Sequence, residues 1–405
     1  MSADSRSGAS RFPVAPRVRR GLSARVSPSL STLSTPALLL ERRVLSANLD
    51  RLSARATALG VLLRPHLKTA KCGEVAALAK DRGPLAGLTV STLHEAEYFY
   101  ARGHRDLFYA VTIEPGKFAR AAALVRAGAR LTLACDNLAM GAALAAAGAE
   151  LGVRFAVLIE IDCGDHRSGL MPEDPDVLAL AQTLQAGPST ELRGVCTHGG
   201  HSYAGRSVAD HVATAEVERA AAVGVAERLR AAALPCPVVS VGSTPTAMHA
   251  AHLRGVTELR CGVYMFGDLF QAAIGSCTEA DIAISVLAAV IGHRRERNQL
   301  LIDAGALALS KDLNTSQLPP AQRTGYGAVA TLNGKRLPGF TVAGVSQEHG
   351  QIASVAPIDF GKFPIGTRLR ILPNHSCLTA AAYDRYHVLD GGPDVVATWT
   401  RTNGW

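Results

Sequence analysis

The 405-residue sequence predicts an α/β protein, a (β/α)8 TIM barrel followed by a mostly-β C-terminal domain. From about residue 55, short β-rich runs alternate with alanine-rich, helix-like stretches, which is the pattern of repeated βα units. After Phe266 the long amphipathic stretches end, and β-like runs alternate with turns rich in Gly, Pro and Asn. A doubly wound open sheet is the alternative, but no G-x-G-x-x-G follows the first strand candidate.

Eight strand candidates make up the predicted barrel, which we expect to span residues 36–270. They are Val61–Arg64, Leu88–Ser91, Leu107–Val111, Leu131–Cys135, Phe155–Ile161, Leu192–Thr197, Pro237–Val241 and Glu258–Cys261. Crossover helices are predicted between them, among them Phe118–Ala127, Met140–Ala147, Pro175–Gln185 and Ala209–Ala232.

The C-terminal domain is expected over residues 271–405. Its strand candidates are Ala283–Ile291, Gln299–Ile302, Phe340–Val345, Ile352–Val355 and Arg368–Ile371. Residues 36–42 precede the first barrel helix and could pair with this domain instead of the barrel.

Composition describes a folded cytoplasmic protein, with 48% hydrophobic and 19% charged residues and no apolar run of membrane-spanning length. The net charge is +8, but residues 1–30 contain six arginines and one acid, so the basicity belongs mostly to this segment. We expect a disordered basic tail there, although its composition also resembles a transit peptide. The body has no basic stripe with interleaved aromatics, so no nucleic-acid partner is expected. The eight scattered cysteines form no C-x-x-C pair, which fits a reducing compartment.

Lys68 is the first candidate for chemistry, because it ends an apolar run and stands outside any charge cluster. A desolvated lysine at a strand end has a lowered pKa and can act as a nucleophile or form a Schiff base. A solvated lysine at a strand-to-helix turn is the plainer interpretation.

Polar residues gather at the ends of the later strand candidates, where the chemistry of such barrels is found. The fifth ends in an acidic segment with Arg167, which favours either a charged site or a surface salt-bridge loop. The sixth ends in a glycine-rich loop carrying His198, His201 and Tyr203, an unusual composition for core packing. At least one of these three side chains is expected in a site.

Two glycine-containing segments have the composition of a phosphate cradle. Gly242, Ser243 and Thr244 follow the seventh strand candidate, and Gly262, Val263 and Tyr264 follow the eighth. Backbone N–H groups at such positions bind phosphate in this fold. An ordinary turn with a helix cap explains Gly-Ser-Thr-Pro equally well when it is considered alone.

His375 and Cys377 form a His-x-Cys pair near the C-terminus. An imidazole and a thiolate on one side of an extended segment suit zinc or a similar ion, but two ligands leave the coordination incomplete. By spacing alone this signal is weak.

Five ordered motifs together resemble the D-serine dehydratase / D-threonine aldolase family, pyridoxal-phosphate enzymes of the alanine-racemase fold. They are Pro65-His66-Leu67-Lys68-Thr69, the segment Glu160–Gly169, Gly242-Ser243-Thr244-Pro245-Thr246, Ser346-Gln347-Glu348-His349-Gly350 and Pro373-Asn374-His375-x-Cys377. They cover residues 36 to about 390.

The resemblance implies a role for each candidate residue. Lys68 would hold pyridoxal 5'-phosphate as a Schiff base; Gly242, Ser243, Thr244, Gly262, Val263 and Tyr264 would bind its phosphate; and Arg167, His198 and Tyr203 would surround its ring. His375 and Cys377 would bind a divalent metal, zinc being preferred to manganese or magnesium. A homodimer, with each site completed near the partner's β domain, is also implied.

Two reactions of a D-3-hydroxy amino acid are compatible with the resemblance. In β-elimination, Lys68 takes the Cα proton, and a 2-keto acid and ammonia result. In retro-aldol cleavage, His198 or His201 takes the hydroxyl proton, and glycine and an aldehyde result. His-x-Cys favours the dehydratases, because the aldolase branch resembles His-x-Asp at this place.

Two other functions remain open at this point. A pyridoxal-phosphate carrier would not need the second domain or the His-x-Cys pair. A racemase would need a second base opposite Lys68, for which Tyr326 and Tyr383 are candidates, and it would leave the pair unexplained.

Overall fold

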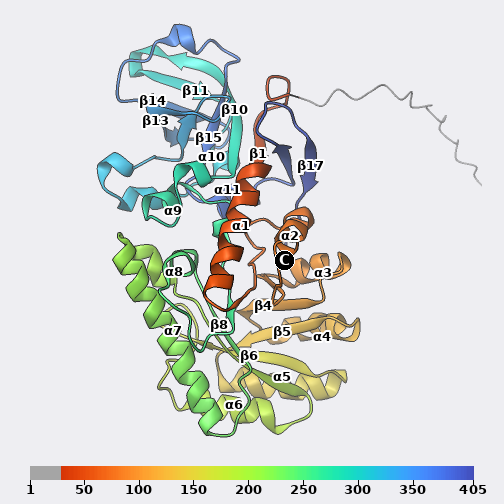
Figure 1. Cartoon of the computed structure of the whole chain (residues 1–405). Helices are drawn as coiled ribbons and strands as arrows, with labels where there is room; N and C mark the ends of the chain where they lie inside the picture. Colours follow the sequence, from red (N-terminus) through yellow and green to blue (C-terminus); the bar gives the residue numbers. More distant parts are fainter. Residues whose placement is uncertain (1–28) are drawn as a thin grey trace, which may run out of the picture.

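The computed structural model describes residues 29–405 and confirms the predicted fold class, a barrel with a separate β domain. The barrel is the lower part of Figure 1. Its strands are β2 (Leu62–Leu63), β3 (Leu88–Val90), β4 (Asp106–Thr112), β5 (Arg130–Cys135), β6 (Phe155–Ile161), β7 (Thr190–Thr197), β8 (Val238–Val241) and β9 (Glu258–Leu259). They run parallel in the order β2-β9-β8-β7-β6-β5-β4-β3. Parallel bridges from Leu63 to Leu85 and from His66 to Thr89 close this sheet into a barrel.

Helices cover the outside of the barrel between successive strands. They are α1 (Arg42–Ala58), α2 (Gly73–Lys80), α3 (Leu93–Ala101), α4 (Phe118–Arg126), α5 (Leu138–Leu151), α6 (Asp176–Ala186), α7 (Val208–Ala231) and α8 (Thr244–His249). Ser207 begins the longest of them with a capping box to Asp210, which satisfies N–H groups that the first turn leaves free. None of the described helices is both long and apolar enough to cross a bilayer.

The β domain is the upper part of Figure 1 and is mostly antiparallel. Its strands are β10 (Ile284–Arg294), β11 (Gln299–Ile302), β12 (Ala328–Ala330), β13 (Arg336–Val345), β14 (Gly350–Ser354), β15 (Arg368–Leu372), β16 (Arg385–Leu389) and β17 (Ala397–Thr400), together with β1 (Ala37–Glu41). Because β11 pairs with both β14 and β10, six strands close on themselves, and β1, β16 and β17 extend the sheet beyond β10.

Short helices connect the strands of the β domain and the two domains. They are α9 (Leu269–Ala273), α10 (Ala306–Leu309) and α11 (Ser376–Ala381), with 3-10 turns such as η2 (Gly200–Ala204), η3 (Val263–Met265) and η6 (Asn314–Gln317). The first strand lies in the β domain, where it pairs with β10 and β16. The chain thus begins in one domain and passes through α1 into the other (Figure 1).

The last residues of the chain return to the barrel, and Figure 1 shows the C-terminus beside α2 and α3. Arg401 is 7% exposed, and its Nε donates to the carbonyl of Ala70 at 3.1 Å. Its Nη1 donates to the carbonyls of Ala380 and Tyr383. One guanidinium therefore joins the turn that carries Lys68 to α11, which follows His375.

The tail predicted for residues 1–30 lies outside the described residues except at its end. Leu30 is buried against the β domain, and its N–H donates to Pro393. The folded part of the protein therefore includes the last residues that the sequence assigned to the tail.

Replacing Arg401 by Ala should lower the free energy of unfolding by about 2–4 kcal/mol, because a buried side chain and its hydrogen bonds to three carbonyls are lost together. The midpoint of urea unfolding measures the effect. Arg385→Ala is the matched control, since this arginine pairs with Asp384 on the surface and its loss should leave the midpoint unchanged. Equal midpoints for the two variants would contradict the assigned role of Arg401.

Candidate active site

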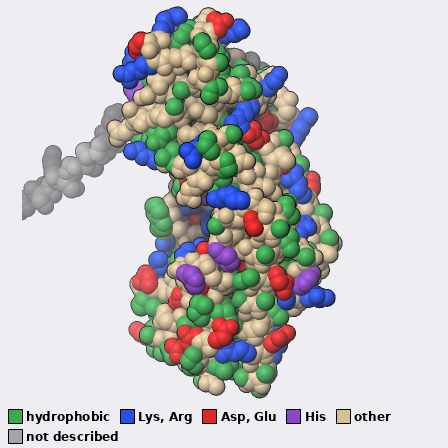
Figure 2. Space-filling model, turned by 90° about the vertical axis from the view of Figure 1, so that its left-hand side faces the viewer, with side chains coloured by type: hydrophobic (Ala, Val, Ile, Leu, Met, Phe, Trp, Pro, Cys, Tyr) green, Lys and Arg blue, Asp and Glu red, His purple; other side chains and the backbone are tan. Residues whose placement is uncertain are grey.

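A cavity of about 590 Å³ opens at the C-terminal ends of the barrel strands and is bounded on its far side by the β domain. Figure 2 shows the molecule hollowed between its two lobes, with basic side chains in and around the hollow. The lining residues include His66, Lys68, Thr69, Arg167, His198, Tyr203, Gly242, Ser243, Thr244, Arg260, Gly262, Val263, Gln271, Asn314, Gln317, His375 and Cys377. Among the described residues that line it there is no aspartate or glutamate. The cavity is therefore suited to an anionic ligand.

Lys68 stands in the turn after β2, and its side chain is exposed to the cavity. The turn is fixed on both sides, because His66 donates its N–H to the carbonyl of Cys261 and Leu67 donates to Thr89, each at 2.9 Å. Burial lowers the pKa of the Lys68 amine; nearby Arg167 also lowers it, whereas Cys377 raises it. The unprotonated, nucleophilic amine is thus favoured relative to a lysine in water.

The segments after β8 and β9 form a cradle that only glycine allows. Gly242 has a φ of +137°, and a Cβ at this position would lie 2.6 Å from the carbonyl oxygen of Arg260. A Cβ at Gly262 would lie 2.7 Å from the carbonyl oxygen of His66. Thr244 begins α8 and Val263 begins η3, so neither N–H has a partner within its own helix.

The Thr244 hydroxyl provides a second indication of a ligand, because it is buried without a hydrogen-bond partner. Ser243 caps α8 through Thr246 and shares a hydrogen bond of 2.8 Å with Ser202. Free N–H groups and an unpaired hydroxyl on one glycine-lined wall are the donors that a phosphate requires.

His198 lies on the wall next to the cradle, where its Nδ1 is 2.9 Å from the carbonyl oxygen of Gly242. A carbonyl only accepts, so Nδ1 carries the proton and Nε2 keeps its lone pair. Burial and the charge of Lys68 lower the pKa of His198 to about 3. The ring of Tyr203 lies 6.3 Å away between centroids. The imidazole is therefore neutral and fixed in orientation.

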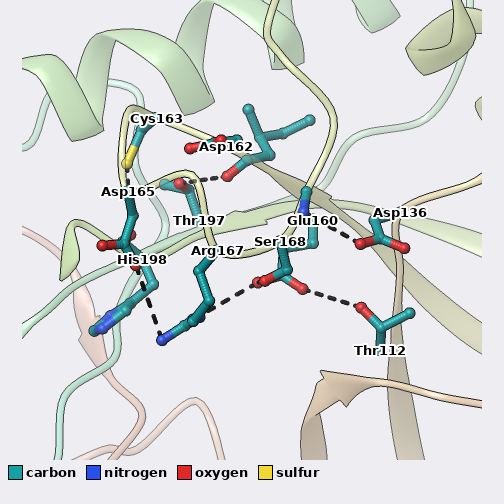
Figure 3. A network of polar contacts seen from close by, with 12 residues as sticks. Thr112, Asp136, Glu160, Asp162, Cys163, Asp165, Arg167, Ser168, Thr197 and His198 are labelled. Atoms are coloured by element: carbon teal, nitrogen blue, oxygen red, sulfur yellow. Dashed lines mark hydrogen bonds and ion pairs between the residues drawn. The ribbon is translucent and has the colours of Figure 1, made fainter. Parts of the chain in front are cut away.

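Arg167 is the part of the acidic loop that reaches the cavity, and Figure 3 shows it between Glu160 and Asp165. Its guanidinium is 3.9 Å from Glu160 and 4.0 Å from Asp165, and its side chain is 55% exposed. Asp162 shapes the loop instead, because its carboxylate accepts from the N–H groups of Gly164 and His166. The segment thus combines a structural turn with one arginine that remains available to a ligand.

His375 and Cys377 both line the cavity on the side of the β domain. Burial opposes ionisation of both side chains, but their mutual interaction raises the pKa of His375 to about 9 and lowers the pKa of Cys377. Cys377 Sγ also lies 3.2 Å from the Thr69 hydroxyl, next to Lys68. No group of three or more His, Cys, Asp or Glu side chains that could hold a metal converges within residues 29–405, so this pair would have open coordination positions.

Buried hydrogen bonds fix the loop that carries His375 and Cys377. Asp268 accepts from the N–H of Ser376 at 3.1 Å, and Asn374 donates to the carbonyls of Asp312 and Gly325. These buried contacts keep the loop in place without occupying the two candidate ligands.

The structure does not bring all the predicted site residues to the cavity. His201 is turned by η2 towards Gly164 and does not line the cavity, because positions two apart on a 3-10 helix face different directions. The Tyr264 side chain lies in a separate small pocket beside α1. Residues 346–349 form an exposed turn between β13 and β14, away from the lining.

Several lining residues were given no role from the sequence: His66 and Thr69 appear there only as part of the Lys68 motif, and Arg260 and Gln317 were not named. Arg260 donates to the carbonyl of Thr197 at 2.7 Å and is almost fully buried. An arginine within an otherwise apolar strand end is a signal that could have identified it. Gln317 lies far from the motifs in sequence and had no such signal.

Comparisons with known proteins match both domains. A family model described as the alanine racemase N-terminal domain matches residues 41–269, and one described as a putative serine dehydratase domain matches residues 283–389. The chain is 47% identical to D-threo-3-hydroxyaspartate dehydratase of Delftia sp., over 93% of this chain and 99% of that protein. It is 32% identical to D-serine dehydratase of Dictyostelium discoideum, over 93% and 98%.

Solved structures agree with these matches. The Delftia dehydratase has a TM-score of 0.90, covering 93% of this chain and 100% of that chain at 47% identity. D-threonine aldolase from Filomicrobium marinum, at 24% identity and a TM-score of 0.77 over 93% and 97%, shares the fold. The chain therefore belongs to the D-serine dehydratase / D-threonine aldolase family of alanine-racemase-like proteins.

Proposed function

We propose that this protein is a pyridoxal-phosphate- and metal-dependent lyase that eliminates water from a D-3-hydroxy amino acid, and that hydrolysis of the resulting enamine gives a 2-keto acid and ammonia. One observation carries the proposal: a single cationic cavity brings Lys68, a glycine-lined phosphate cradle and the His375–Cys377 pair together. The 47% identity to a D-threo-3-hydroxyaspartate dehydratase along nearly the whole chain supports the same reaction.

The residues present fit pyridoxal phosphate. Lys68 would hold the cofactor through its amine, and Thr244, with the N–H groups of the cradle, would bind the phosphate. Tyr203 and His198 would flank the ring. When bound, the cofactor supplies an electron sink for the pair released at the substrate Cα.

The residues also fit a divalent metal, for which we propose zinc. An imidazole and a thiolate with open positions form a donor set that suits zinc better than manganese or magnesium. Two solved structures of the Delftia dehydratase carry a histidine or a cysteine replaced by alanine, two positions apart, and the cysteine variant is metal-free. His375 and Cys377 have the same order and spacing. The ion would supply Lewis acidity near the β-carbon of the substrate.

The proton chemistry favours elimination over retro-aldol cleavage. Burial lowers the pKa of Lys68, which favours the unprotonated amine that would accept the Cα proton. Retro-aldol cleavage needs a base for the hydroxyl proton, and His198, with a pKa of about 3, is a poor one. His201, the other candidate, does not line the cavity. The two bases that would favour the aldolase are therefore unsuitable.

The charge of the cavity supports an acidic substrate. Two arginines and a lysine line it without a carboxylate among the described lining residues, which is more positive charge than the phosphate of the cofactor requires. We therefore propose D-threo-3-hydroxyaspartate before D-serine. The racemase alternative has less support, because neither Tyr326 nor Tyr383 lines the cavity of the described chain.

The products distinguish the two reactions directly. Incubated with D-threo-3-hydroxyaspartate, the protein should release oxaloacetate and ammonia in equal amounts, measured with coupled dehydrogenase assays. D-serine, tested in parallel, should be converted to pyruvate less efficiently. Glycine and glyoxylate as the main products would overturn the proposed elimination in favour of retro-aldol cleavage.

Lys68→Ala should abolish the visible absorption that pyridoxal phosphate shows on the wild-type protein, because the amine that holds it is gone. Lys80→Ala is the control, since Lys80 is an exposed lysine at the end of α2. A wild-type protein that stays colourless after reconstitution with pyridoxal phosphate would refute the proposed function.

Cys377→Ala should reduce bound metal from one equivalent to almost none, as measured by inductively coupled plasma mass spectrometry. Turnover should fall at least about 100-fold while the cofactor absorption remains, because the two sites use different residues. Cys277→Ala, which removes a thiol away from the cavity, is the control. Undiminished turnover in the metal-free variant would rule out a catalytic metal.

A further inference from the structure

A buried carboxylate outside the cavity connects two of its walls. Glu218 lies in the middle of α7, is 1% exposed and does not itself line the cavity. Its Oε1 accepts from the N–H of Gly199 at 2.6 Å and from the N–H of Gly242 at 2.9 Å. These glycines belong to the loops after β7 and β8, so one oxygen atom holds both loops.

The two loops carry different parts of the site. The first contains His198, and the second continues into Ser243 and Thr244 of the cradle. Both backbone polar groups of Gly242 are hydrogen-bonded, since its N–H donates to Glu218 and its carbonyl accepts from His198 Nδ1. The orientation of the imidazole and that of the cradle are therefore set relative to the same carboxylate.

Close packing leaves little alternative to this arrangement. A Cβ at Gly199 would lie 3.1 Å from the Glu218 carboxyl carbon, so the loop is seated directly on the side chain. Burial raises the pKa of Glu218, and the Thr246 side chain and the two backbone N–H groups oppose this shift. A carboxyl group is costly at such a position unless its hydrogen bonds repay the loss of solvation.

We propose that Glu218 is a positioning residue that preforms the phosphate cradle and fixes His198 by holding the backbone of both loops. It acts through Gly199 and Gly242 and touches neither cofactor nor substrate. The inference rests on the proposed function only in taking the cradle's ligand to be a phosphate group. What the cradle requires is an acceptor with the reach of glutamate, and its charge is secondary.

Three substitutions of Glu218 test separately whether the length of its side chain or its charge is needed. Glu218→Gln keeps the accepting oxygen at the same distance and removes the charge. Glu218→Asp keeps the charge, but its carboxylate is shorter by one carbon–carbon bond, about 1.5 Å. Glu218→Ala removes both. Glu227→Ala, an exposed glutamate on the same helix, is the matched control.

Binding of inorganic phosphate and of pyridoxal phosphate to the full-length, cofactor-free protein should be measured by calorimetry. Glu218→Asp and Glu218→Ala should raise both dissociation constants about tenfold or more, and Glu218→Gln should stay within about twofold of wild type. Wild-type affinity in the Asp and Ala variants would overturn the proposal. A Gln variant as weak as the Ala variant would overturn the acceptor role.

Amide hydrogen exchange tests the inference without a ligand. Peptides covering residues 197–204 and 240–246 should exchange faster in the Asp variant than in the wild type or the Gln variant, and unchanged exchange would overturn the proposal. This measurement remains decisive if Glu218→Ala does not fold. If the wild type binds neither inorganic phosphate nor pyridoxal phosphate, the proposed function is refuted. The role of Glu218 is still tested in that case, because amide exchange needs no ligand.

Discussion

The concentration of positive charge in one cavity is the constraint on which the remainder of the structure depends. Lys68, Arg167 and Arg260 point into a common space with no carboxylate among the described lining residues. Burial is the main reason that the pKa of Lys68 falls and the pKa of His198 reaches about 3, and the neighbouring cations lower both further. Such a site is at its most stable when an anion occupies it, so ligand binding and the stability of the folded protein are coupled.

The two domains meet at this positively charged cavity, and hydrogen bonds join them beside it. The turn after Lys68 is bonded from the β domain by Tyr386, whose hydroxyl donates to Ala70 at 2.7 Å, and by Arg401. Thr69 contacts Cys377 directly. If Lys68 holds the cofactor and the His375–Cys377 pair binds metal, as proposed, their separation must stay within a fraction of an ångström for a shared substrate. The C-terminal segment provides that rigidity although it contributes no side chain to the cavity lining.

The barrel and most of its site could be predicted from sequence because both depend on local patterns. β6 and β11 have the predicted bounds, and Lys68, Arg167, His198, His375 and Cys377 follow strand ends or form short motifs. What could not be predicted depends on long-range geometry. The turn of η2 directs His201 away, and Glu218 acts from a helix interior where a glutamate usually faces water. β12 and β16 were missed, since short strands carry little periodicity.

Whether the proposed reaction is β-elimination or retro-aldol cleavage depends on which side chains of the cavity can accept a proton. Burial keeps His198 neutral and Gly242 fixes its orientation, and Lys68 is the amine that lines the same cavity as the cradle. In the proposed function Lys68 would remove the Cα hydrogen, and His375 and Cys377, on the side of the β domain, would hold the metal that assists the leaving group. Elimination needs one base and one Lewis acid, whereas retro-aldol cleavage needs a base at the hydroxyl itself. Glu218 holds the N–H of Gly242, and the carbonyl of the same residue orients His198, so this one carboxylate helps to set both the cradle and the imidazole beside it.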